Sequence, residues 1–251
     1  MEHWIEHVDE PDRLILAWQA HAGQSDRRRW AVGELARAPE GATFRYFKDE
    51  EFSALNEGRP ANELVAAGFL GYPTFQRQSN DAGVYTKDVL EAFMRRLPPS
   101  ARSDFPRYLE YFRLRTRERL SPFALLGATE ARLPSDGFSL VDPLRAESTA
   151  RELIFEVAGH RHHLEGRSGL VAGQRLDLVP EPHNTHDRHA VRIEASGVLI
   201  GYVNRLQSPT VDYWLAHRAV SAWLLRLNGT SDAPRAFVFV KVRPLHARKA
   251  A

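Results

Sequence analysis

Six histidines in two short segments of the second half of the chain are the residues best suited to chemistry. They are His160, His162, His163, His183, His186 and His189. Imidazole groups that gather in space can hold zinc or nickel. Their spacing matches no standard zinc motif, so a metal site remains an alternative, and the prediction itself contains no metal ligand and no cofactor.

Arginine indicates a second chemistry, which is contact with an anion. Residues 1–150 contain 20 Lys and Arg against 23 Asp and Glu, whereas residues 151–251 contain 14 against 9, a surplus of 5. Nearly all of this positive charge is arginine, whose planar guanidinium makes bidentate contacts with phosphate and stacks on bases. The second half is therefore expected to meet nucleic acid, although a genome that favours Arg codons would give the same composition.

Catalytic motifs are missing from the sequence. The acidic pairs Asp9-Glu10 and Glu50-Glu51 are adjacent in the chain, so their side chains point apart and are typical of a solvated surface. No Walker loop, nucleophile elbow or paired metal-carboxylate motif occurs. We therefore predict that the protein is not an enzyme.

Several features favour the cytoplasm. The chain has no cysteine, which excludes disulfides and thiol nucleophiles and suits a reducing compartment. No apolar run approaches the length of a membrane span, and the first residues, Met1-Glu2-His3-Trp4, lack the apolar region of a secretory signal.

The elements of the first half predict an α+β domain. Its expected strands are at 13–19, 30–35 and 43–47. Its expected helices are at 61–67, 86–97, 103–119 and 121–126, the last with Ser121 as its cap and Pro122 at its first position.

The second half predicts a small barrel. Its β-rich runs are at 153–158, 175–179, 190–194, 198–203, 220–227 and 235–243, and one helix is expected at 208–217. Five or six short strands with one inserted helix describe a partly open, OB-like barrel. A break near 140–150, where a polar stretch begins at Asp142-Pro143, then separates an α+β domain over 1–145 from a mainly-β domain over 151–247.

Residues 151–246 resemble the HIRAN family. The most specific motifs are the run Glu181-Pro182-His183-Asn184-Thr185-His186-Asp187-Arg188-His189-Ala190-Val191 and the triplet Ile200-Gly201-Tyr202. Asn184 and Asp187 are short polar residues that can fold a turn around their own backbone. Gly201 allows another backbone to approach closely, as a barrel corner requires.

The resemblance implies binding to nucleic acid, in particular to single-stranded DNA and its 3′ ends. The family makes these contacts with an Arg–aromatic–aromatic stretch and an Asn…Asp pair. Arg161 falls on the arginine and would hold a phosphate, while His162 and His163 fall on the aromatic positions and would stack on bases. Asn184 and Asp187 fall on the polar pair, where Asp187 would accept a hydrogen bond from the 3′-hydroxyl and Asn184 would read a base edge or sugar.

The expected DNA-binding set also includes Tyr202, which closes the second motif, and Arg205, which follows it. Histidine in place of the family's aromatic residues weakens stacking and adds a dependence on pH.

The first half resembles the N-terminal subdomain of HipA-type toxin kinases. The matching segments are Leu97-Pro98-Pro99, Pro122–Thr129, Val32–Leu35 and Phe44–Tyr46. The chain has no room for the kinase core, so this resemblance implies a docking or structural domain.

Together these features predict a non-catalytic DNA-binding adaptor in repair, replication or defence, with a possible protein partner on the first half. Two alternatives remain. One is a protein-interaction module of a toxin–antitoxin-like or phage-defence system, and the other is an accessory to a metal-dependent hydrolase that uses the histidines.

Overall fold

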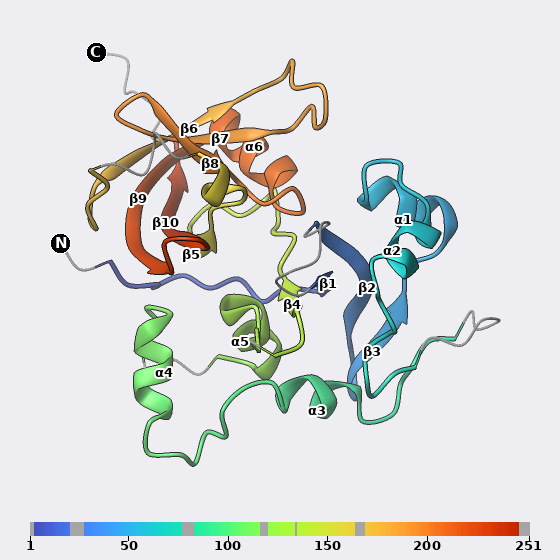
Figure 1. The fold of residues 1–251 in the computed structure, drawn as a ribbon. Helices are drawn as coiled ribbons and strands as arrows, with labels where there is room; N and C mark the ends of the chain where they lie inside the picture. Colours follow the sequence, from blue (N-terminus) through green and yellow to red (C-terminus); the bar gives the residue numbers. More distant parts are fainter. Residues whose placement is uncertain are drawn as a thin grey trace. The chain divides into compact units, whose positions relative to one another are not determined.

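The computed structural model describes residues 3–20, 28–76, 83–115, 120–133, 135–163 and 169–245, which fold into two compact units (Figure 1). The barrel unit contains Met1–Asp9, Leu109–Glu118 and Leu144–Ala251, and the α+β unit contains Glu10–Tyr108 and Arg119–Pro143. A boundary near residue 145 was expected from the sequence. The expectation did not include the two short segments of the first half that belong to the barrel unit.

The α+β unit is built on an antiparallel sheet with the strand order β3-β2-β1-β4. Its strands are β1 (Arg13–Gln19), β2 (Arg29–Ala38), β3 (Gly41–Tyr46) and β4 (Phe138–Val141). The sequence prediction missed β4, whose four residues are all buried and therefore show no alternation of polar and apolar side chains.

The helices of this half are shorter than the sequence pattern indicates. They are α1 (Asp49–Leu55), α2 (Ala61–Ala66), α3 (Val89–Met94), α4 (Phe105–Tyr111) and α5 (Pro122–Thr129). The expected helix at 103–119 ends early because Arg113 adopts a left-handed conformation with φ of 57°. The expected cap of α5 is confirmed, since the Ser121 hydroxyl accepts a hydrogen bond from the N–H of Ala124.

The barrel unit contains a six-stranded antiparallel sheet with the order β5-β10-β9-β6-β7-β8. Its strands are β5 (Arg151–Glu156), β6 (Arg175–Pro180), β7 (Val191–Ala195), β8 (Val198–Tyr202), β9 (Arg218–Gly229) and β10 (Pro234–Pro244). Ala158, just beyond β5, pairs with Tyr202 at the end of β8. The two edges of the sheet therefore meet at one point, and the predicted α+β plus OB-like fold class is confirmed.

A single apolar core fills the barrel. Alternate residues of β10 (Ala236, Val238, Val240 and Val242) are fully buried, as expected when one face of a strand points inward. The inserted helix α6 (Ser208–His217) adds Val211 and Trp214 to this core. The indole N–H of Trp214 donates to the backbone carbonyls of Arg145 and Ala146 at 3.2 and 3.1 Å.

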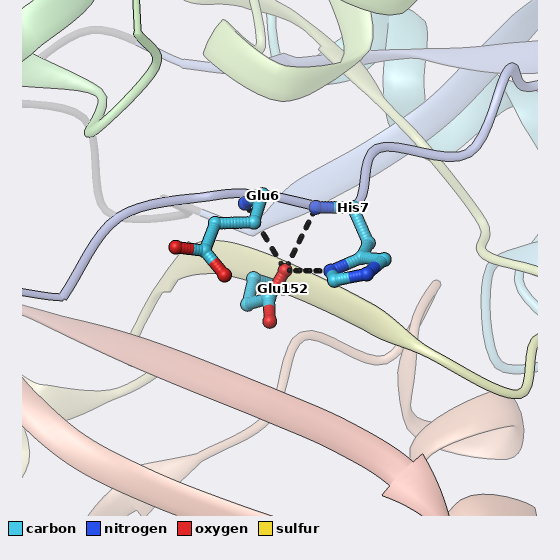
Figure 2. Close-up of side chains that lie close together, drawn as sticks. All are labelled: Glu6, His7 and Glu152. Atoms are coloured by element: carbon cyan, nitrogen blue, oxygen red, sulfur yellow. Dashed lines mark hydrogen bonds and ion pairs between the residues drawn. The ribbon is translucent and has the colours of Figure 1, made fainter.

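The first residues of the chain are anchored on β5 by the buried carboxylate of Glu152 (Figure 2). One of its oxygens accepts hydrogen bonds from the backbone N–H groups of Glu6 and His7, at 3.1 and 2.8 Å. Ile5 is buried beside Leu114 and donates its N–H to the carbonyl of Arg113 at 2.9 Å. These contacts explain why two short segments of the first half fold with the barrel.

No helix in the described residues combines the length and the apolar character that crossing a lipid bilayer demands.

Candidate nucleic-acid site

The loop after β5 begins with a left-handed glycine and one turn of 3-10 helix. Gly159 has φ of 72° and is followed by the helix η1 (His160–His162). His160 is only 3% exposed, and its Nδ1 lies 2.8 Å from the carbonyl oxygen of Ile200 on β8. His160 therefore holds the loop against the barrel and has no surface to offer a ligand.

Arg161 and His162 form the outer part of this loop. Arg161 donates from Nε to Nε2 of His162 at 2.9 Å, so the His162 ring carries its hydrogen on Nδ1 in this arrangement. No carboxylate lies within ion-pair distance of Arg161 in the described ranges. A guanidinium with no carboxylate partner in these ranges, beside an exposed imidazole, suits a phosphate.

His163 and Tyr202 place two aromatic rings side by side across the loop and β8. Their centroids are 6.0 Å apart with an angle of 55° between the rings. Burial lowers the pKa of His163, and the charges of His162 and His160 lower it further, which favours the neutral ring near pH 7. Burial raises the pKa of Tyr202, and the carboxylate of Glu181 adds to that rise.

Gly201 allows the chain just beyond β5 to lie close to β8. A Cβ atom on Gly201 would lie 2.5 Å from both the carbonyl oxygen of Ala158 and Cγ1 of Val157, and its φ is 140°. The backbones of Ala158 and Tyr202 exchange two hydrogen bonds at 2.8 and 2.9 Å directly beside it. The structure thus shows the close backbone approach expected at this glycine.

Asn184 builds the second loop. Its side-chain oxygen accepts the N–H groups of His186 and Asp187 at 2.9 and 3.1 Å, and its amide donates to Glu181 at 2.6 Å. Both lone pairs of the oxygen are occupied, so one amide hydrogen is what Asn184 has left for a ligand.

Asp187 joins this turn to the start of α6. One carboxylate oxygen accepts the N–H of His189 at 2.8 Å, and the other accepts the hydroxyl of Ser208 at 3.0 Å. Ser208 is fully buried, and its hydroxyl also lies 3.1 Å from the carbonyl of Arg205. Each oxygen of Asp187 keeps one lone pair, which is enough to accept a further hydrogen bond.

Two pairings near these residues were not predicted from the sequence. Glu181 bonds to Asn184 and lies beside Tyr202, so it links the turn to β8. His189 lies 3.0 Å from Asp212 on α6 through Nδ1 and accepts from Arg188 through Nε2. Glu181 belongs to the HIRAN motif and could have been found there, whereas nothing in the sequence paired His189 with Asp212.

The contacts connect most of the predicted site, because the side chain of Asn184 also accepts the N–H of Asp187. His163 and Tyr202 lie together, and Glu181 connects Tyr202 to Asn184. Asp187 and Arg205 are connected through Ser208. Within the described residues, no hydrogen bond or ion pair joins Arg161 to Asn184 or Asp187.

The six histidines do not gather into a metal-type cluster in the part of the chain that is described. The group found there is Glu6, His7 and Glu152, whose ligand atoms lie within 4.8 Å of one another (Figure 2). Glu152 is already saturated, because it accepts from two backbone N–H groups, His7 and Arg243. These contacts outweigh its burial and lower the pKa of Glu152, as befits a structural anchor.

A comparison with protein-family models agrees with the motifs. Residues 151–222 match the family model of the HIRAN domain. Among solved structures, the chain is similar to the HIRAN domain of human HLTF, with 17% sequence identity, a TM-score of 0.31, and coverage of 36% of this chain and 74% of that chain. A search of curated proteins gave no match. The resemblance inferred from the sequence is therefore confirmed for residues 151–222, which match the HIRAN family model.

Proposed function

We propose that this protein binds single-stranded DNA and its 3′ ends through the two loops of its HIRAN domain, as an adaptor without catalytic activity. The observation that carries the proposal is Arg161, a guanidinium without a carboxylate partner in the described residues, on a loop of the segment that matches the HIRAN model. Such a group gains most from an anionic ligand, because no protein charge has to be displaced first.

Each side chain receives a role from the hydrogen-bond donors and acceptors that its contacts within the protein leave unused. Arg161 holds a phosphate, and the rings of His162, His163 and Tyr202 stack on bases. Asp187 uses a free lone pair to accept the terminal 3′-hydroxyl. Asn184 donates its remaining amide hydrogen to a base or sugar acceptor.

The α+β unit serves in this proposal as a docking domain for a protein partner. Its sheet and helices enclose their own core, in which Arg96 is buried and bonded to Asp136 and to two backbone carbonyls. A unit that encloses its own core leaves its surface available for an interaction. Removing residues 10–108 alone would not test this, because the α+β unit also includes 119–143.

The proposal is tested by an electrophoretic shift series with three labelled DNAs. These are a single strand with a 3′-hydroxyl, the same strand with a 3′-phosphate, and a blunt duplex. We expect the tightest binding to the 3′-hydroxyl strand, weaker binding to the 3′-phosphate strand, and the weakest to the duplex. Failure to bind all three at low salt would refute the proposal.

A further inference from the structure

The barrel unit has a second basic surface, away from the motifs that identify the HIRAN domain. Arg113 and Arg226 have no carboxylate within ion-pair distance among the described residues, whereas their neighbours do. Arg235 makes a bidentate pair with Glu156 at 2.6 and 2.8 Å, and Arg115 lies 3.7 Å from Glu6. In the described part of the chain, Arg113 and Arg226 are therefore charges without an ion-pair partner.

A β-bulge sets the direction of Arg226. On β9 and β10, Phe237 pairs with Arg226 and Val238 pairs with Leu224, so Leu225 is the extra residue. A bulge bends its strand and re-aims the adjacent side chain. Here it brings the guanidinium of Arg226 to 3.9 Å from the ring centroid of Tyr111 and 4.4 Å from that of Phe237.

The guanidinium of Arg226 is held by rings and not by charge. Nη1 donates to the carbonyl of Tyr111 at 2.9 Å. Nε and Nη2 are closed off from solvent and have no hydrogen-bond partner within the described residues. A buried donor without a partner is costly, and its charge acts more strongly in a medium of low dielectric.

The surrounding charges do not compensate Arg226. Burial lowers its pKa, the Tyr111 hydroxyl opposes that effect, and the cations Arg113 and Arg235 lower the pKa further. Arg113 and Arg115 each lie 5.8 Å from the ring of Trp4. Positive groups have thus been assembled against aromatic rings, and an anion would relieve their mutual repulsion.

The aromatic rings beside these arginines indicate which class of anion would bind. Tyr111 remains 45% exposed although Arg226 lies against it, and its hydroxyl accepts a hydrogen bond from the amide of Asn228 at 2.7 Å, which fixes the ring. Exposed aromatic rings beside arginines are the arrangement that holds single-stranded nucleic acid, where rings stack on bases and guanidinium groups face phosphates. An acidic protein would use the charges but would have no need of an exposed, fixed ring.

We propose that Trp4, Tyr111, Arg113, Arg226 and Phe237 form a second contact surface for single-stranded nucleic acid. Arg113 contacts a phosphate, Tyr111 stacks on a base, and Arg226 adds its charge and fixes the Tyr111 ring. This surface rests on the proposed function, because it extends the path of the strand that the HIRAN loops bind. It lies on three segments of the barrel unit, all of which are outside the residues that match the HIRAN model.

The test compares single strands of about 5 and about 16 nucleotides, the range of site sizes of one OB-type fold. The double variant Arg113→Gln/Arg226→Gln should bind the long strand about tenfold more weakly. The slope of its affinity against salt should fall by about 0.7 for each phosphate that the variant no longer neutralises. Its affinity for the short strand should equal that of the wild type.

The control is Arg102→Gln/Arg107→Gln, which removes two exposed arginines of the α+β unit and should leave both affinities unchanged. If the wild type binds both strands and the Arg113/Arg226 variant is indistinguishable from it, the second surface is refuted while the proposed function stands. If the wild type binds neither strand, the proposed function fails as well.

A measurement on the wild type tests the proposal without relying on a variant that could misfold. A long strand that carries 5-bromouracil is cross-linked by light, and the labelled peptides are identified by mass spectrometry. Labels at Trp4 or Tyr111 with the long strand support the proposal. Labels confined to the HIRAN segment overturn it.

Discussion

The two loops of the HIRAN segment are built in opposite ways. In the turn 181–190, the side chains of Asn184 and Asp187 accept hydrogen bonds from backbone N–H groups. They also bond to the side chains of Glu181 and Ser208. In the loop 159–163, His160 anchors the backbone, while Arg161 contacts the neighbouring His162 and no carboxylate in the described ranges.

This difference teaches which residues can be changed without changing the fold. A side chain that completes a turn contributes to stability and to binding together, and its removal affects both. A side chain without structural partners can be removed at little cost to the fold. Variants of the two loops should therefore separate stability from affinity.

The largest effect is expected at Gly201 on β8, where the backbone of Ala158 approaches closely. Gly201→Ala forces a Cβ atom to within 2.5 Å of Ala158 and strains a backbone with φ of 140°. Overpacking and strain together should lower the free energy of unfolding by about 3 kcal/mol, measured by urea denaturation. Gly197→Ala is the control, because Gly197 also has a positive φ but nothing within 4 Å. Equal losses in both variants would show that the close approach is unimportant.

The next effect tests the structured turn. Asp187→Ala removes the acceptor for the N–H of His189 and for the Ser208 hydroxyl, so we expect a loss of about 1–3 kcal/mol in unfolding free energy. The ratio of affinities for 3′-hydroxyl and 3′-phosphate strands should also approach one. Asp177→Ala, an exposed position on β6, is the control. Unchanged stability together with an unchanged ratio would contradict both roles of Asp187.

The open loop should show the reverse behaviour. Arg161→Ala should change the unfolding free energy by less than about 0.5 kcal/mol. Its affinity for single-stranded DNA should fall about tenfold, and its salt slope should fall by about 0.7, as expected when one phosphate is no longer neutralised. Arg107→Ala, at an exposed position, serves as the control for charge. Should Arg161→Ala destabilise the protein as much as Asp187→Ala does, the comparison of the two loops would be wrong.

The smallest effect concerns pH. The pKa of His163 is lowered from its ordinary value of 6.5, chiefly by burial, so the folded protein binds this proton less readily than the unfolded chain does. The contribution to stability is therefore complete above pH 6.5 and is lost as the pH falls through the lowered value. His163→Gln should flatten the dependence of melting temperature on pH as the pH falls below 6.5. Equal curves for His163→Gln and the wild type would exclude this role.

Local chemistry explains what the sequence could predict. The runs that became β5–β10 alternate or end at turn residues, and the close approach at Gly201 follows from the residue type. The turn at Asn184 and Asp187 was predicted because short polar side chains bond to their own backbone.

Long-range partners explain what the sequence could not predict. Ile5 is buried and pairs with Leu114, far away in the sequence. Glu152 anchors Glu6 and His7, which precede it by 146 and 145 positions. The helical pattern of 103–119 continues past the point where Arg113 turns left-handed. His160 had the same appearance in the sequence as His162, although one is buried and the other exposed. None of these outcomes has a local signature.

The central claim is that the two HIRAN loops form one site for single-stranded DNA. Amide chemical shifts of the labelled protein, recorded during titration with a strand of about 5 nucleotides, test it most directly. We predict that the largest shifts fall together on residues 160–163, 184–189 and 202–208, with a common dissociation constant. Shifts that leave 160–163 or 184–189 unchanged at saturation would contradict the claim.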